Sequence, residues 1–129
     1  MKAVYANGTN YDDPLSVLEV GTMPEPETKP FWSTIRVNSA SVNHHDMWSL
    51  QGVGLSDEQT PMILGTDAAG VLEEDIPVRK GLKAGSEVVL YTFVGTDGAG
   101  VMPGERRSIL SERYAGTMAE YTQVPSANV

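Results

Sequence analysis

Short stretches in which apolar and polar residues alternate recur along the chain, and this two-residue period predicts β-strands. The clearest is 34–42, where Ile35 and Val37 share one face and Ala40 and Val42 keep the period after a bulge expected near Ser39. Further strands are expected at 1–6, 16–20, 87–93 and 116–124, and around Val71 and Leu72. The pattern therefore predicts a chain built mainly from strands.

The segment 44–50 is the expected helix. It contains neither Pro nor Gly, it follows Asn43, which is a favourable N-cap residue, and Gly52 ends it. We expect about two helical turns. This helix would begin directly where the strand 34–42 stops, so the side chains at its start lie at a strand end.

Glycine and proline residues are spread between these segments and predict the turns. Prolines mark 24–30 as an extended, exposed connector, 81–85 has turn chemistry, and 95–104 reads as a long flexible loop. Short strands joined by such turns, with one small helix, indicate an all-β barrel or a β-rich α+β fold. With 129 residues, the chain is expected to form one domain around one core.

The charge balance and the absence of cysteine narrow the function. Nine Lys and Arg against seventeen Asp and Glu give a net charge of −8. We expect neither nucleic acid nor an anionic membrane as a partner, because both bind through dense positive charge. The lack of cysteine excludes disulfides and thiolate zinc sites and fits a cytoplasmic protein. No export signal and no stretch long enough to span a membrane are expected.

Four motifs follow one another along the chain. They are 41–48 (SVNHHDMW), 61–71 (PMILGTDAAGV), 81–89 (GLKAGSEVV) and 116–121 (GTMAEY). The second is similar to the signature Pro-x-x-x-Gly-His-Glu-x-x-Gly, and the fourth to Gly-Thr-Phe-Ala-Glu-Tyr. On these motifs the chain resembles the N-terminal, GroES-like catalytic domain of the medium-chain dehydrogenases/reductases. That superfamily includes zinc alcohol dehydrogenases, quinone oxidoreductases and enoyl reductases.

The resemblance implies a mainly β fold, a GroES-like β-barrel with one or two short helices, over residues 1–129. In this family the barrel packs against a Rossmann domain and the active site lies between them. The chain has no Gly-x-Gly-x-x-Gly motif after a strand, so we expect the Rossmann domain beyond Val129. NADP or NAD is expected to bind mainly there, and the full-length protein is expected to be a homo-oligomer.

The positions of the family's catalytic zinc ligands carry Asn43 and Thr66 in place of Cys and His. A neutral amide and a hydroxyl bind zinc weakly. Asp67 replaces the usual Glu beside them. The segment 95–110, which carries four cysteines in relatives with a structural zinc, has none. We therefore expect no zinc, and we expect 95–110 to be poorly ordered without a metal.

The resemblance also suggests roles for three residues of the expected helix. His44 stands where relatives often face the cofactor phosphates, and His45 stands where a Ser or Thr often relays the substrate proton. Histidine suits either role, and both residues are also explained as surface or cap residues of a short helix. Trp48 replaces a relay His. Because indole cannot relay a proton, Trp48 is expected to line the substrate pocket, together with Thr66 and Asp67.

Asn43 and Asp46 complete the expected catalytic set with His45. Asn43 can donate a hydrogen bond to a substrate carbonyl or a ribose hydroxyl, and Asp46 resembles the family's Asp that orients neighbouring groups. Each also has a structural explanation, since Asn43 suits a helix N-cap and Asp46 complements the helix dipole.

These features together predict a zinc-independent, NAD(P)H-dependent oxidoreductase that reduces a small carbonyl, enone or quinone substrate, with this chain inactive by itself. One alternative is a zinc-type alcohol dehydrogenase domain with a degenerate metal site. Another is a stand-alone GroES-like module that binds a ligand or partner without catalysis. A third possibility is that the chain is a trimmed fragment, because relatives cross into their second domain near the position of residues 126–129.

Overall fold

The computed structural model describes residues 1–77, 81–95 and 107–129. Nine short strands and one α-helix make up the described regular structure, together with three 3₁₀ turns. The strands are β1 (Lys2–Ala6), β2 (Leu18–Thr22), β3 (Trp32–Ala40), β4 (Met62–Ile63), β5 (Ala68–Leu72), β6 (Glu87–Val89), β7 (Phe93–Val94), β8 (Ser108–Ile109) and β9 (Tyr121–Pro125). The helical segments are α1 (His44–Leu50), η1 (Pro14–Val17), η2 (Asp57–Gln59) and η3 (Ser126–Asn128).

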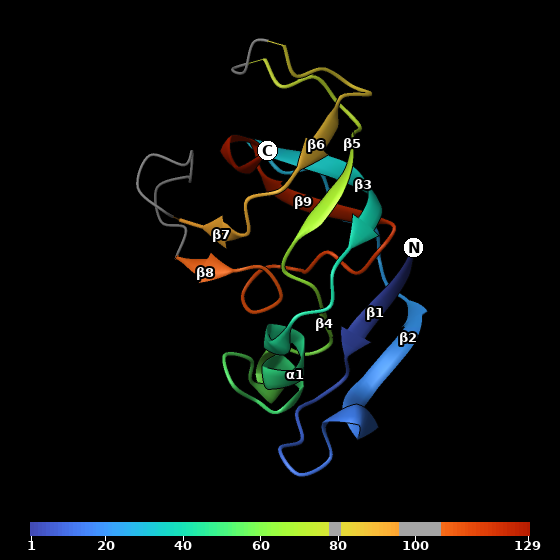
Figure 1. Cartoon of the computed structure of the whole chain (residues 1–129), viewed down its shortest axis with the longest axis vertical. Helices are drawn as coiled ribbons and strands as arrows, with labels where there is room; N and C mark the ends of the chain where they lie inside the picture. Colours follow the sequence, from blue (N-terminus) through green and yellow to red (C-terminus); the bar gives the residue numbers. More distant parts are fainter. Residues whose placement is uncertain (78–80, 96–106) are drawn as a thin grey trace.

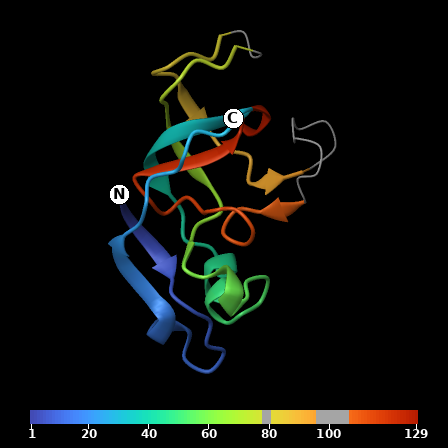
Figure 2. The ribbon, with the colours of Figure 1, turned by 180° about the vertical axis from the view of Figure 1, so that it is seen from behind.

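The strands form three antiparallel sheets, with the orders β2-β1-β4, β6-β5-β3-β9 and β7-β8. The β1–β2 hairpin and α1 lie at one end of the molecule, and the four-stranded sheet lies toward the other end with the C-terminus (Figures 1 and 2). The predicted β-rich fold with one short helix is confirmed. The described strands do not close into one continuous barrel, because an isolated bridge between Ala3 and Ala119 stands where a ladder would join two of the sheets.

Several predicted boundaries are confirmed and others shift. The helix 44–50 and the irregularity in β3, between Val37 and Ser39, lie where they were expected. The strand predicted at 16–20 begins later, at Leu18, because η1 occupies the residues before it. Of the strand predicted at 116–124, only the part from Tyr121 onward is extended in a sheet. The predicted loop 95–104 lies almost wholly outside the described residues.

The strand predicted at 87–93 is divided in two by a buried side chain from the C-terminus. Asn128, 1 % exposed, donates from Nδ2 to the carbonyl oxygens of Tyr91 and Phe93, each at 2.8 Å. The amide of Tyr91 donates in turn to the Asn128 carbonyl at 2.7 Å. These bonds satisfy the backbone between β6 and β7 in the way a neighbouring strand would, so no sheet partner is needed there.

Two hydrophobic clusters stabilise the fold. The larger cluster packs against the four-stranded sheet. It includes the fully buried Ile35 and Val124 of the sheet and Leu110 from outside it. The smaller lies under α1 and joins Leu50 and Leu64 to Ala6 of β1. Burial of such side chains is the main source of folding free energy. Within the described ranges, no helix is long and apolar enough to cross a membrane.

A backbone crossing connects the two ends of the molecule. The amides of Gly116, Thr117 and Met118 donate to the carbonyls of residues 63–65, at 2.8–3.1 Å. A side chain at 116 would clash with the carbonyl oxygens of Ile63, Leu64 and Gly65, so glycine is required for this close approach. The crossing fixes the segment that follows β4.

We expect Gly70→Ala in β5 to destabilise the fold by about 2–3 kcal/mol. The new methyl group would overlap the carbonyl oxygen of Arg36 in the neighbouring strand β3, and this backbone atom cannot move away. Gly21→Ala in β2 is the matched control, since its methyl group would meet only the end of the flexible Tyr5 side chain. Urea unfolding of both variants measures the difference. Equal losses of stability would show that the β3–β5 approach is not a tight constraint.

A second prediction concerns the pH dependence of the β1–β2 hairpin. The hydroxyl of Tyr5 donates to Glu19 at 2.7 Å, and Asn7 donates to the other carboxylate oxygen at 2.7 Å. The Tyr5 hydrogen bond, followed by that of Asn7, lowers the pKa of Glu19 below its usual 4.5. A lowered pKa in the folded state adds stability above pH 4.5 that is lost as the pH falls.

Tyr5→Phe removes the larger of these two causes. The difference in urea midpoint between the wild type and Tyr5→Phe should therefore be largest near pH 7 and shrink as the pH falls below 4.5. Tyr11→Phe, at a tyrosine that is 71 % exposed, is the control. A midpoint difference that stays constant from pH 7 to pH 3 would contradict the prediction.

Candidate functional site

The carboxylate of Asp46 connects two of the sequence motifs. Oδ2 accepts a hydrogen bond from the backbone amide of Asn43 at 2.8 Å, and Oδ1 accepts one from the amide of Gly65 at 2.8 Å. Asp46 is only 5 % exposed, so both bonds are shielded from water. Hydrogen bonds to a charged acceptor are stronger than neutral ones. Asp46 therefore holds the start of α1 against the segment 65–67.

A row of polar side chains lies beside this contact. Asn43 donates from Nδ2 to the hydroxyl of Thr66 at 3.2 Å and to that of Ser41 at 3.1 Å. The Ser41 hydroxyl donates to Asp67 Oδ1 at 2.6 Å. The structure thus brings together Asn43, Thr66 and Asp67, which the sequence analysis assigned to one site from positions more than twenty residues apart.

This polar row does not offer the ligand groups that zinc requires. The Nδ2 group of Asn43 is a hydrogen-bond donor directed at Thr66, and Asp67 is engaged by Ser41. Zinc sites in proteins are built from thiolate, imidazole and carboxylate groups. Among the described residues, no group of three or more His, Asp or Glu side chains is placed to hold a metal ion. The residues present do not fit a zinc ion.

The two histidines have different surroundings. The ring of His44 is exposed and stacks on Trp48, with the centroids 6.1 Å apart and an interplanar angle of 17°. Trp48 is itself 52 % exposed, and its predicted place in the substrate pocket stays a prediction. His45 is more enclosed. Its Nε2 lies 3.0 Å from Glu112 Oε1, and its Nδ1 lies 3.5 Å from the hydroxyl of Ser49.

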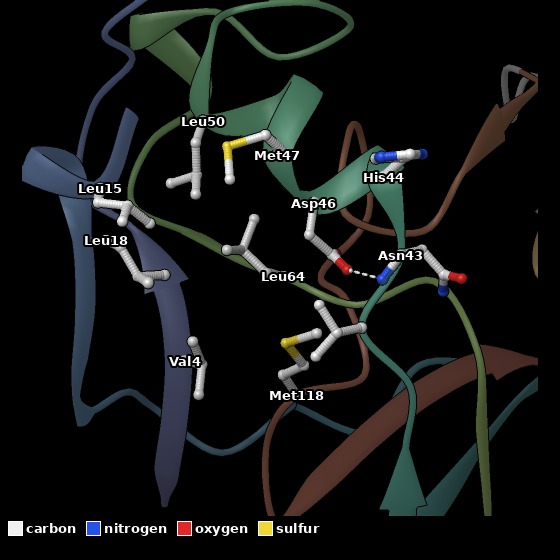
Figure 3. A pocket seen from close by; sticks show the side chains of 11 residues that line it. Val4, Leu15, Leu18, Asn43, His44, Asp46, Met47, Leu50, Leu64 and Met118 are labelled. Carbon is white, nitrogen blue, oxygen red and sulfur yellow. Dashed lines mark hydrogen bonds between the residues drawn. The ribbon is translucent and has the colours of Figure 1, made fainter. Parts of the chain in front are cut away.

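Two hollows flank α1. One, of about 640 Å³, lies between α1 and the β1–β2 hairpin; Figure 3 shows Met47 and Leu50 facing Leu15 and Leu18 across it, with Asn43 and His44 at the other end. The second is a cleft of about 450 Å³. It is lined by His45, Phe93, Val94, Arg107, Ser108, Ile109 and Glu112. His44 and His45 therefore border different cavities.

Glu112 and Ser41 are the site residues that sequence reasoning did not identify. Glu112 is separated from His45 by 67 positions, and no spacing or periodicity relates the two. Ser41 lies inside a motif that was recognised, but a serine at a strand end is common and carries no signal of its own. Only the fold shows that these side chains meet the predicted site.

Asp46→Asn should destabilise the chain by about 2–3 kcal/mol, because a neutral amide places a donor against one of two buried backbone amides. Asp57→Asn is the matched control, since that exposed carboxylate also accepts two hydrogen bonds, both from Thr9, and water can replace them. We expect a loss of about 1 kcal/mol or less for the control. Urea unfolding measures both losses of stability. Similar losses in the two variants would show that the buried hydrogen bonds of Asp46 stabilise the fold no more than the exposed ones of Asp57.

Comparisons with known proteins agree with the motifs. The family model of the alcohol dehydrogenase GroES-like domain matches residues 29–129. No curated protein matches the sequence of the chain. Among solved structures, an NAD-dependent alcohol dehydrogenase is 35% identical, with a TM-score of 0.79 over 99% of this chain and 38% of that one. A cobalt- and zinc-bound thermostable alcohol dehydrogenase from Pyrobaculum aerophilum is 29% identical, with a TM-score of 0.77, over 99% of this chain and 40% of that one.

A more distant match shows the fold alone. A crotonyl-CoA carboxylase/reductase is 21% identical, with a TM-score of 0.71 over 95% of this chain and 32% of that one. The chain thus spans about two fifths or less of the length of these solved structures. The chain belongs to the alcohol dehydrogenase GroES-like domain family, and so to the medium-chain dehydrogenases/reductases.

Proposed function

We propose that this chain is the substrate-binding half of a zinc-independent, NAD(P)H-dependent reductase that acts on small enones, quinones or related carbonyl compounds. The hydrogen bond between Asn43 Nδ2 and Thr66 Oγ1 carries the proposal, because it occupies the place of two metal ligands with a neutral donor and acceptor. The similarity to an NAD-dependent alcohol dehydrogenase supports a nicotinamide cofactor.

Without a metal ion, another group must polarise the substrate carbonyl. Asn43 carries two donor hydrogens on Nδ2, at the meeting point of α1 and the segment 65–67, and the hydroxyls of Ser41 and Thr66 accept them in this structure. A substrate carbonyl would take the place of one of these two acceptors. A fixed amide donor aimed at a developing negative charge is a general way to stabilise it. Asn43 is thus the proposed electrophilic group, with Thr66 and Asp67 beside the substrate. Asp46 keeps Asn43 in place through its backbone amide.

The cofactor would be held mainly by the expected nucleotide-binding domain. From this chain, the exposed imidazole of His44 is the proposed donor to a cofactor phosphate. When bound, the reduced nicotinamide supplies the hydride that this chain cannot supply. The chain orients the substrate and provides the proton that accompanies the hydride, and His45 lies with Glu112 in a cleft suited to that proton transfer.

The test uses the full-length protein that carries this chain. We expect NADH- or NADPH-dependent reduction of an enone or quinone that dialysis against a zinc chelator leaves unchanged, and metal analysis well below one zinc per chain. Stoichiometric zinc together with loss of activity on chelation would favour a zinc-type alcohol dehydrogenase instead.

Asn43→Ala should lower kcat by about 10²-fold, the usual effect of removing one donor to a developing oxyanion. Asn38→Ala, at an exposed asparagine of β3, is the control and should leave kcat unchanged. Steady-state rates and circular dichroism of both variants measure this. Full activity of a folded Asn43→Ala variant would exclude Asn43 as the electrophilic group.

A further inference from the structure

The imidazole of His45 is held from both sides. Nε2 meets Glu112 Oε1 at 3.0 Å, and Nδ1 faces the hydroxyl of Ser49, one helical turn away and fully buried, at 3.5 Å. The ring therefore directs Nδ1 into the protein and Nε2 at the carboxylate. With this orientation, His45 has no ring nitrogen directed past Glu112 at a substrate.

One carboxylate oxygen of Glu112 makes only a long hydrogen bond. Oε1 is occupied by His45, whereas the described partner of Oε2 is the hydroxyl of Ser108, at a long 3.4 Å. That hydroxyl also donates to the carbonyl of Ile109 at 3.1 Å. The side chain of Glu112 is 28% exposed and that of His45 17%. Glu112 is thus the more accessible member of the pair.

Glu112 borders a cleft that is large enough to hold a small molecule. The cleft that Glu112 borders, of about 450 Å³, has Phe93, Val94 and Ile109 among its lining residues. A space of this size accommodates a small organic molecule.

The backbone holds Glu112 firmly. The residue before it, Ser111, is fully buried and has a φ of 73°, in the left-handed region that residues other than glycine rarely adopt. Its amide donates to the carbonyl of Tyr114 at 2.8 Å, and Gln59 Nε2 donates to the Glu112 carbonyl at 2.9 Å. Strain of this kind persists only where the surrounding contacts impose it, and it recurs at functional sites.

We propose that Glu112 is the catalytic acid that delivers the proton to the substrate, and that His45 is the positioning residue that orients its carboxylate. The proposal rests on the proposed reductase function. For an enone, hydride adds to the β-carbon and the electron pair of the double bond takes a proton from Glu112 at the α-carbon. Glu112 is left as a carboxylate, and a proton from solvent restores it directly, because Glu112 is the more accessible member of the pair. The nicotinamide is oxidised and the enone becomes a saturated ketone.

The first test reads the pair without any substrate. His44 and His45 are the only histidines in the chain, so ¹⁵N labelling of histidine gives two sets of ring signals. Glu112→Gln should shift the Nε2 signal of His45 and leave those of His44 unchanged. Glu73→Gln, at an exposed carboxylate paired with Arg36, is the control and should shift neither. An unchanged His45 signal in Glu112→Gln would overturn the pairing on which the proposal depends.

The second test measures turnover of the full-length protein. Glu112→Ala should lower kcat by about 10²–10⁴-fold, the usual contribution of a general acid, and formate should restore part of the rate by entering the space left. Glu112→Gln fills that space, so formate should not rescue it. His45→Gln should lower kcat less than Glu112→Gln does, with KM little changed.

The opposite order of effects would overturn the assignment. A His45→Gln variant more impaired than Glu112→Gln would make His45 the acid, and full turnover in a folded Glu112→Gln variant would exclude Glu112. A wild-type protein inactive with enones and quinones would overturn the reductase function and the acid role together. The histidine signals separate these failures, because they report the pair whether or not the protein is a reductase.

Discussion

The carboxylate of Asp46 is the contact on which the arrangement of the site depends. It is a charged group with almost no exposure to water, and such a group is stable only when its oxygens are satisfied. Its two partners are backbone amides from α1 and from the segment after β4. Their separation is therefore set by the width of one carboxylate. Asn43, and Thr66 next to Gly65, are therefore held close enough to each other for their side chains to form a hydrogen bond.

The site shows how a metal-binding framework can persist with different chemistry. The fold brings residues 43, 66 and 67 together as the family's pattern requires, yet the groups there are an amide, a hydroxyl and a carboxylate already held by Ser41. A row of hydrogen bonds can keep such a framework in register, because each neutral donor has an acceptor beside it. We propose that acid chemistry is then the task of a separate pair, His45 and Glu112.

Local patterns allowed much of the fold to be predicted, and the failures have a common cause. The helix 44–50 and the bulge in β3 depend on neighbours in sequence, such as Asn43 and the alternation around Val37. The break between β6 and β7 depends on Asn128, and the surroundings of His45 depend on Glu112. These partners lie 37 and 67 positions away along the chain, beyond any periodicity. The family motifs identified Asn43, Thr66 and Asp67, but Glu112 lies in none of them.

The crossing of residues 116–118 over 63–65 also determines when the site can form during synthesis. The segment 65–67 receives hydrogen bonds from Thr117, through both its amide and its hydroxyl. A chain growing from the ribosome therefore carries all the residues of α1 and β4 long before it holds the ones that fix Thr66 and Asp67. Contacts of such long sequence separation form slowly, because the loop between them must close first. The segment 65–67 can thus be fixed only after Thr117 has been synthesised, although most side chains of the site are made earlier.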